Sequence, residues 1–193
     1  MDHIEALARA YAGLAELLDE VTLADHERPT PCAEWNLGQL LGHIVGATEA
    51  FAIVLQRGPT PARARIDPTA ATGAALRAAA SLTVAGWRSP GALDRDYDSV
   101  IELDDGVLIP PIPLPGSMLL DINLLDVGVH LHDVATSLGR SEAVRDDELA
   151  DATLDAARLI LQPGIRELVG FAAERPAAND ANAVERLLAF VGR

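Results

Sequence analysis

Asp126 and His130 are placed so that they could bind one metal ion together. They lie four residues apart in a segment that is otherwise rich in Leu, Val and Ile. Each residue of a helix turns about 100°, so these two side chains project within about 40° of one another. A carboxylate and an imidazole one turn apart can chelate an ion. They can equally form a plain hydrogen-bonded pair, and the spacing alone leaves both interpretations open.

A third candidate ligand lies on a different predicted helix. His43 follows Leu40 by three residues and adjoins Ile44, which places it near the apolar face of that helix. Catalytic zinc is commonly held by three N or O ligands with a fourth position open, and bundles build such sites from facing helices. The predicted metal ligands are therefore His43, Asp126 and His130, and a hydrogen-bonded core histidine is the alternative for His43.

Helix geometry separates the remaining polar residues of this segment. Asp133 falls about 20° from Asp126, so it shares the stripe of His130, and a contact with that ring would fix its tautomer. We expect Asp133 to be solvated or to support a ligand. His132 points about 200° away from His130, and three histidines are predicted to lie on the surface: His3, His26 and His132.

The elements that must position these residues are predicted to be helices. Hydrophobic residues make up 49% of the 193-residue chain and aromatic residues only 4%, so the core must consist of Leu, Ala, Val and Ile. Apolar periodicity, prolines and capping residues predict six helices, at about 2–22, 37–58, 68–87, 117–139, 145–162 and 183–191. Asn36, Asp67 and Ser117 are the expected N-caps of the second, third and fourth.

Residues 90–116 have a different character. Two short apolar runs flank Asp104-Asp105-Gly106, a hairpin turn signal, and four prolines follow. A short hairpin or irregular crossover is expected here. The chain as a whole, residues 1–193, is predicted to be one all-α domain.

Charge and cysteine content limit the classes of function. The net charge of −14 argues against binding to nucleic acid or to an anionic membrane. The acidic start favours an amphipathic helix over a signal peptide. The sequence contains no run of about 20 apolar residues, so no membrane span is predicted. The single cysteine, Cys32, fits a reducing cytoplasm. We expect it to be a half-buried loop residue that is not a nucleophile.

Two motifs resemble a known family. Residues 29–36, PTPCAEWN, followed by His43, are similar to a "TPC-x-E/D-W" signature that precedes a histidine. Residues 126–135, DVGVHLHDVA, are similar to an "E/D-x-x-x-H-x-W-D-L-A" signature. Both are typical of DinB-like metal-binding proteins related to the N-terminal domain of mycothiol-dependent maleylpyruvate isomerase. Residues 185–193 resemble the ending of small, largely uncharacterised members.

This resemblance implies a four-helix bundle with a long connection before its last helix, extra C-terminal helices, and a zinc or nickel ion. The family's ligand positions fall on His43, Asp126 and His130. Asp126 stands where the isomerase has Glu, and His132 replaces the usual Trp. Members of this class are often dimers, which makes a homodimer an expected state.

Three functions follow from the resemblance and the residues. The first is a transferase or isomerase that uses mycothiol or a similar thiol with a small-molecule substrate. The chain has no room for the isomerase's second domain, so the isomerase reaction itself is not expected. The second is a metal-dependent hydrolase, for which Asp133 is the one candidate base. The third is a binding or stress-response module without turnover.

Overall fold

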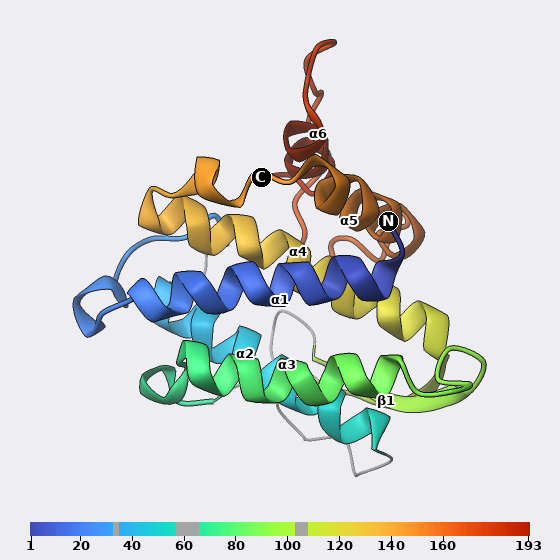
Figure 1. The fold of residues 1–193 in the computed structure, drawn as a ribbon. Coiled ribbons are helices and arrows are strands. Elements are labelled where there is room, and N and C mark those ends of the chain that lie inside the picture. Colours follow the sequence, from blue (N-terminus) through green and yellow to red (C-terminus); the bar gives the residue numbers. More distant parts are fainter. Residues whose placement is uncertain (33–34, 57–65, 103–107) are drawn as a thin grey trace.

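Four helices enclose the main core of the protein (Figure 1). The computed structural model describes residues 1–32, 35–56, 66–102 and 108–193. Helix α1 packs against α3 and α4, and α2 closes the ring by packing against the same two helices. This arrangement confirms the prediction of an all-α bundle. The bounds of its helices are α1 His3–Glu20, α2 Leu37–Leu55, α3 Gly73–Trp87 and α4 Gly116–Leu138.

Local capping explains where the first two helices begin. The Asp2 carboxylate accepts hydrogen bonds from the backbone N–H groups of Ile4 and Glu5. Asn36 and Gln39 cap α2 reciprocally, each side chain accepting from the other residue's backbone N–H. Such caps satisfy N–H groups that have no partner inside the helix. The predicted cap at Asn36 is confirmed.

Two predicted helix starts are wrong. Asp67 caps only a short 3₁₀ turn, Pro68–Ala70, and α3 begins later because Thr72 accepts from the backbone N–H of Ala75. Ser117 lies inside α4. The helix begins at Gly116, which approaches the backbone of the preceding loop so closely that a side chain would collide with the carbonyl oxygen of Ala92. The N-cap of α4 is thus Pro115, two residues before the predicted cap at Ser117.

A two-stranded antiparallel hairpin connects α3 to α4, as predicted. Strands β1, Asp96–Glu102, and β2, Leu108–Pro115, pair from Asp96↔Pro115 to Glu102↔Leu108. Neither strand is central in a larger sheet, so the prolines of β2 are tolerated. The predicted turn at Asp104-Asp105-Gly106 lies outside the described residues, and so does the expected end of the second helix near residue 58.

The C-terminal helices cover the outer side of α4. Helix α5, Asp147–Ile160, packs on α4, and α6, Ala183–Phe190, packs on α5. A second apolar cluster fills this layer and includes Leu125 and Val129 of α4. Helix α4 is therefore buried between two cores, which explains why its sequence is apolar nearly all round.

This burial corrects one prediction about the histidines. His132 was expected on the surface but is only 4% exposed. It points away from the candidate ligands Asp126 and His130, into the side of α4 that carries Leu125 and Val129 and that the C-terminal layer helps to bury. Burial lowers the pKa of His132, and the nearby charge of Asp133 opposes that shift. The imidazole is thus a neutral core group.

Helix α2 is the part of the described chain that satisfies a length and composition test for a membrane span. Most of its apolar window, 67%, is buried inside the protein. Its apolar side chains face α3 and α4, so α2 has the burial of a core helix in a bundle.

Candidate metal centre

The fold brings the three predicted ligands together. His43 comes from α2, and Asp126 and His130 come from adjacent turns of α4. One carboxylate oxygen, Asp126 Oδ1, lies 3.0 Å from Nε2 of His43 and 3.3 Å from Nε2 of His130. The ligand atoms of all three residues lie within 4.8 Å of one another. They therefore converge on one small volume at the junction of the two helices.

This geometry fits a divalent ion with tetrahedral coordination. Zinc bonds to nitrogen and oxygen at about 2.0–2.1 Å, so two ligands of one tetrahedral ion lie about 3.3 Å apart. The two nitrogen–oxygen distances around Asp126 have this size. Two imidazoles and one carboxylate also form a donor set that zinc uses at catalytic sites, where a fourth position stays open.

One side of the cluster is accessible to solvent. The side chains of His43 and Asp126 keep 20% and 23% of their surface exposed, whereas that of His130 keeps 8%. Trp35 forms an aromatic wall beside the cluster, with its ring centre 4.7 Å from that of His43. His43 and Asp126 thus form the more exposed side of the cluster, and the Trp35 ring lies next to it.

The loop before α2 positions the Trp35 ring beside the cluster. The Thr30 hydroxyl lies 2.9 Å from the carbonyl oxygen of Cys32 and 2.8 Å from that of Trp35. The backbone N–H of Trp35 also donates to the carbonyl of Cys32. The side chains of Cys32 and Trp35 are thereby directed toward α4.

The charges of the cluster stabilise one another. Burial opposes ionisation of Asp126, but the charge of His43 and hydrogen bonds from both histidines hold the pKa of its carboxyl well below the usual range. Burial likewise opposes protonation of His130, yet its hydrogen bonds to Asp126 and Asp133 raise the pKa of this imidazole well above 6.5. The raised pKa favours protonation of His130 between the two carboxylates, and a metal ion would compete with its Nε2 proton.

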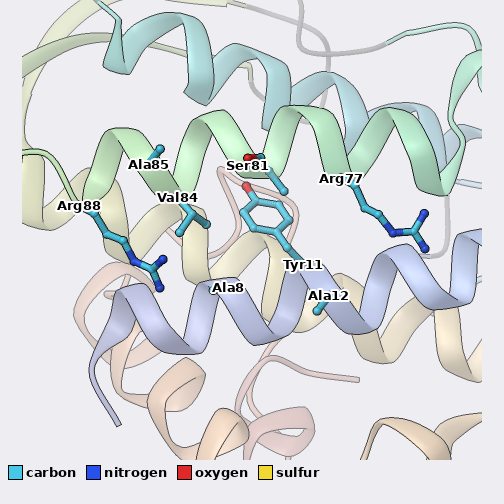
Figure 2. A pocket seen from close by; sticks show the side chains of 9 residues that line it. Ala8, Tyr11, Ala12, Arg77, Ser81, Val84, Ala85 and Arg88 are labelled. Atoms are coloured by element: carbon cyan, nitrogen blue, oxygen red, sulfur yellow. The ribbon is translucent and has the colours of Figure 1, made fainter.

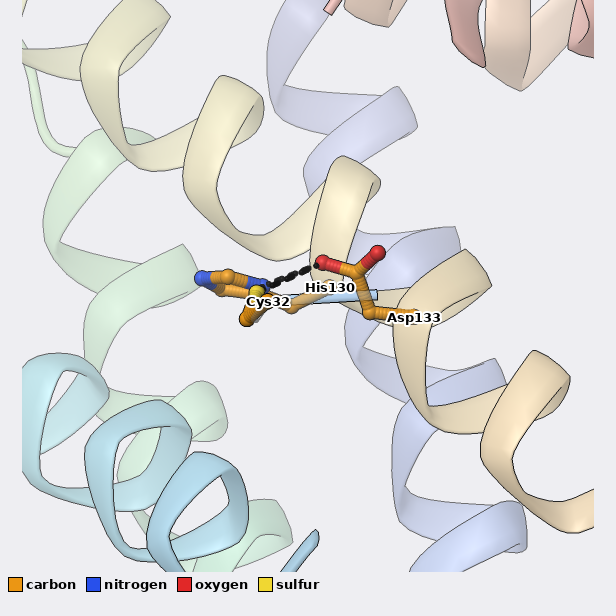
Figure 3. Close-up of side chains that lie close together, drawn as sticks. All are labelled: Cys32, His130 and Asp133. Carbon is orange, nitrogen blue, oxygen red and sulfur yellow. Dashed lines mark hydrogen bonds and ion pairs between the residues drawn. The ribbon is translucent and has the colours of Figure 1, made fainter. Parts of the chain in front are cut away.

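Asp133 supports His130 from the opposite side of the ring. The Asp133 carboxylate accepts a hydrogen bond from Nδ1 of His130 at 3.0 Å, and Figure 3 shows the other ring nitrogen pointing away from it. The Asp133 side chain is 1% exposed, so it is not a solvated group. Its contact with Nδ1 directs Nε2 toward Asp126, which is the tautomer that a metal ion at Nε2 requires.

Two more residues complete this side of the ring. The thiol of Cys32 lies 3.2 Å from Oδ2 of Asp133 and 3.9 Å from Nδ1 of His130. Cys32 is partly buried in its loop, as predicted. The guanidinium of Arg193, the last residue of the sequence, donates to both carboxylate oxygens of Asp133.

Sequence reasoning missed the role of Arg193. It lies 60 residues from Asp133, and no helical spacing connects the two. The one available signal was the resemblance of residues 185–193 to the ending of other small proteins.

A separate groove lies between α1 and α3, with a volume of about 590 Å³ (Figure 2). Small side chains line most of it, and Arg77 and Arg88 stand at its two ends. Its lining residues include no histidine, cysteine or carboxylate. The groove therefore does not belong to the metal centre.

Comparison with known proteins places the chain in a family. The profile of the mycothiol maleylpyruvate isomerase N-terminal domain matches residues 7–135. Two proteins of Mycobacterium tuberculosis, from strains CDC 1551 / Oshkosh and ATCC 25618 / H37Rv, are each 31% identical over 196 residues. In both cases the match covers 100% of this chain and 98% of the relative, and both relatives are described as uncharacterised. No solved structure shows significant similarity to the chain. The profile match spans more than half of the sequence, and the chain therefore belongs to the mycothiol maleylpyruvate isomerase N-terminal domain family.

Proposed function

We propose that this protein binds one divalent metal ion, zinc or alternatively nickel, through His43, Asp126 and His130. The open position of that ion would take the sulfur of mycothiol or a similar small thiol. The observation that carries this proposal is the convergence of two imidazole nitrogens on one carboxylate oxygen, at 3.0 and 3.3 Å. The reaction class that fits is thiol-dependent transfer or isomerisation of a small electrophile.

The residues of the chain have distinct roles in this proposal. His43, Asp126 and His130 hold the ion, and Asp133 keeps the His130 ring in the required tautomer. When bound, a zinc ion lowers the pKa of a coordinated thiol and so supplies a nucleophilic thiolate. The exposed edge beside Trp35 is the side from which the thiol would enter.

A metal-dependent hydrolase fits the site less well. That function needs a base that can reach a water molecule, and the predicted base was Asp133. Its carboxylate is buried and already accepts hydrogen bonds from His130, Cys32 and Arg193. Asp133 lies on the Nδ1 side of the ring, away from the metal position at Nε2, so it cannot serve as that base.

A thiol titration separates the transferase from a non-catalytic metal protein. We would load the full chain with Co²⁺, add mycothiol, and follow the thiolate-to-cobalt band in the near ultraviolet. The expected result is a saturable band with mycothiol and none with its S-methyl derivative, whose sulfur carries no proton to lose. A cobalt-loaded protein that shows no band at saturating mycothiol would contradict thiol binding at the metal and would favour the non-catalytic module.

A further inference from the structure

We propose that Arg193 is a positioning residue of the metal centre, acting through Asp133 on His130. The inference rests on the proposed metal function and adds to it a residue outside the stretch that the family profile matches, residues 7–135. The C-terminal segment of this chain would then be a working part of the centre, in addition to covering α4.

The contact between Arg193 and Asp133 fixes the plane of the carboxylate. Nε of Arg193 lies 3.0 Å from Oδ1 of Asp133, and Nη2 lies 3.3 Å from Oδ2. Two donors on a planar guanidinium thus meet two oxygens on a planar carboxylate, which is the most directional form of ion pair. The side chains are 11% and 1% exposed, so this pair is not a solvent-screened surface contact.

This constraint passes directly to the metal ligand. Oδ2 of Asp133, which Arg193 holds, is the same oxygen that accepts from Nδ1 of His130. A buried carboxylate without a countercharge is strongly disfavoured, and the guanidinium supplies that countercharge. With Arg193 in place Asp133 can remain a fixed acceptor, and the His130 ring keeps Nε2 directed at Asp126.

The guanidinium of Arg193 also indicates which of two groups of candidate ligands is available to a metal ion. Cys32, His130 and Asp133 form a second cluster whose ligand atoms lie within 4.8 Å of one another. Nη2 of Arg193 lies 3.0 Å from the sulfur of Cys32 as well as beside Asp133. The cation of this second cluster is therefore the arginine itself, which leaves the Nε2 side of His130 for the metal ion.

The end of the chain is held firmly enough to aim this side chain. Gly192 has a φ of +78°, and a Cβ there would lie 2.8 Å from backbone atoms of Ala172. The backbone N–H of Arg193 donates to the carbonyl of Leu188, and its guanidinium lies over the ring of Phe171. These contacts set the direction of Arg193 toward α4.

The test measures metal affinity in full-length variants. Wild type, Arg193→Ala, Arg193→Lys and Arg186→Ala would be titrated with Co²⁺, followed by visible absorption and by zinc competition. Arg186 is a matched control, because it sits in the same segment but pairs with Asp151 at the exposed surface. Urea unfolding of each metal-free variant would verify that folded proteins are compared.

Removing a residue that supports a metal ligand typically weakens metal binding about 10- to 100-fold. We expect about a tenfold or greater loss for Arg193→Ala with an altered cobalt spectrum, a smaller loss for Arg193→Lys, and a change below about twofold for Arg186→Ala. Should Arg193→Ala fail to fold, the lysine variant carries the test, since an ammonium cannot make the two-point contact.

Two results would overturn the positioning role. One is wild-type affinity in Arg193→Ala, or in Arg193→Lys if that variant alone folds. The other is an equal loss in Arg186→Ala, which would assign the effect to general loosening of the segment. If wild type itself binds neither Co²⁺ nor Zn²⁺, the proposed function fails first, so the two failures are distinguishable.

Discussion

His130 is the residue at which the two polar networks of the protein meet. Its Nε2 faces Asp126 and His43, and its Nδ1 faces Asp133. One imidazole thus has one edge in the candidate metal cluster and the other edge against Asp133. Neighbouring carboxylates on both edges explain why a histidine that is nearly buried keeps a raised pKa.

The raised pKa of His130 predicts how the stability of the metal-free protein depends on pH. A group whose pKa is higher in the folded state stabilises that state fully below its unfolded value of 6.5. The stabilisation is lost as the pH rises through the folded pKa. Between pH 6.5 and 8 we expect the free energy of unfolding to fall by about 1–2 kcal/mol, as measured by urea unfolding in the presence of a chelator.

His130→Gln provides the comparison for this prediction. Glutamine cannot be protonated, so the decline over the same pH interval should shrink even if the variant is less stable overall, leaving the contribution of His3, whose pKa is also raised by its hydrogen bond to Asp121. An unchanged decline in His130→Gln would assign the pH dependence to another group.

Prediction from sequence succeeded where residues lie on one element. The four-residue spacing of Asp126 and His130 fixes their relative direction, and the structure places both beside His43 as expected. The position of Arg193 could not be predicted from helical spacing, because it depends on how the chain after α4, including α5 and α6, folds back onto α4. His132 failed for the same reason: its exposure is decided by the C-terminal layer.

At the scale of elements, α4 organises the molecule because several of its buried or partly buried polar side chains have partners on other helices or loops. Asp121 pairs with His3 of α1, and Asn123 bonds to two aromatic side chains, one on α1 and one on α3. Asp126 pairs with His43 of α2, and Asp133 bonds to His130 and to Arg193. These residues are predictable as anomalies on an apolar helix, whereas their individual partners require the packed structure.

The buried Asn123 allows this organising role of α4 to be tested. Its side chain accepts from Nε1 of Trp87 at 3.1 Å and donates to the hydroxyl of Tyr11 at 2.9 Å, with no solvent exposure. Asn123→Ala would leave the N–H of Trp87 without its partner, remove one of the partners of the Tyr11 hydroxyl, and create a cavity. We expect a loss of about 2–4 kcal/mol in the free energy of unfolding, measured in urea.

Asp121→Ala is the control on the same helix. Its partner His3 is partly exposed, so the loss should stay below about 1 kcal/mol. Equal losses of unfolding free energy in the two variants would show that the hydrogen bonds of Asn123 stabilise the protein no more than the partly exposed pair of Asp121 and His3.

Helix starts were predicted less well than helices. Thr72 rather than Asp67 caps α3, and a close backbone approach places the start of α4 at Gly116. Several polar residues can cap in each of these loops, and tertiary contacts decide which one does. These shifts leave the site intact, since the rotation of α2 and α4 depends on residues further along each helix.

At the scale of the whole molecule, the order of helices and the hairpin crossover were predictable from periodicity and turn residues. The four-helix bundle was expected only from the family resemblance, and the second core under α5 and α6 was not predicted, because both depend on packing between distant segments. The candidate metal centre depends on both the order of the helices and their packing. It joins α2 to α4 inside the ring, and the C-terminal layer supports it from behind.

Metal content tests the candidate centre most directly. Wild type, His43→Ala, His130→Ala and His3→Ala would be purified without a metal-affinity column, reconstituted with zinc, desalted and submitted to elemental analysis. His3 is the matched control, since it also pairs with an aspartate of α4 but belongs to neither group of candidate ligands.

We predict about one metal ion per chain in wild type and in His3→Ala, and loss of the ion in His43→Ala and in His130→Ala. Wild-type protein that is folded and retains no metal after reconstitution would contradict the central claim, and His43, Asp126 and His130 would then be a hydrogen-bonded core cluster.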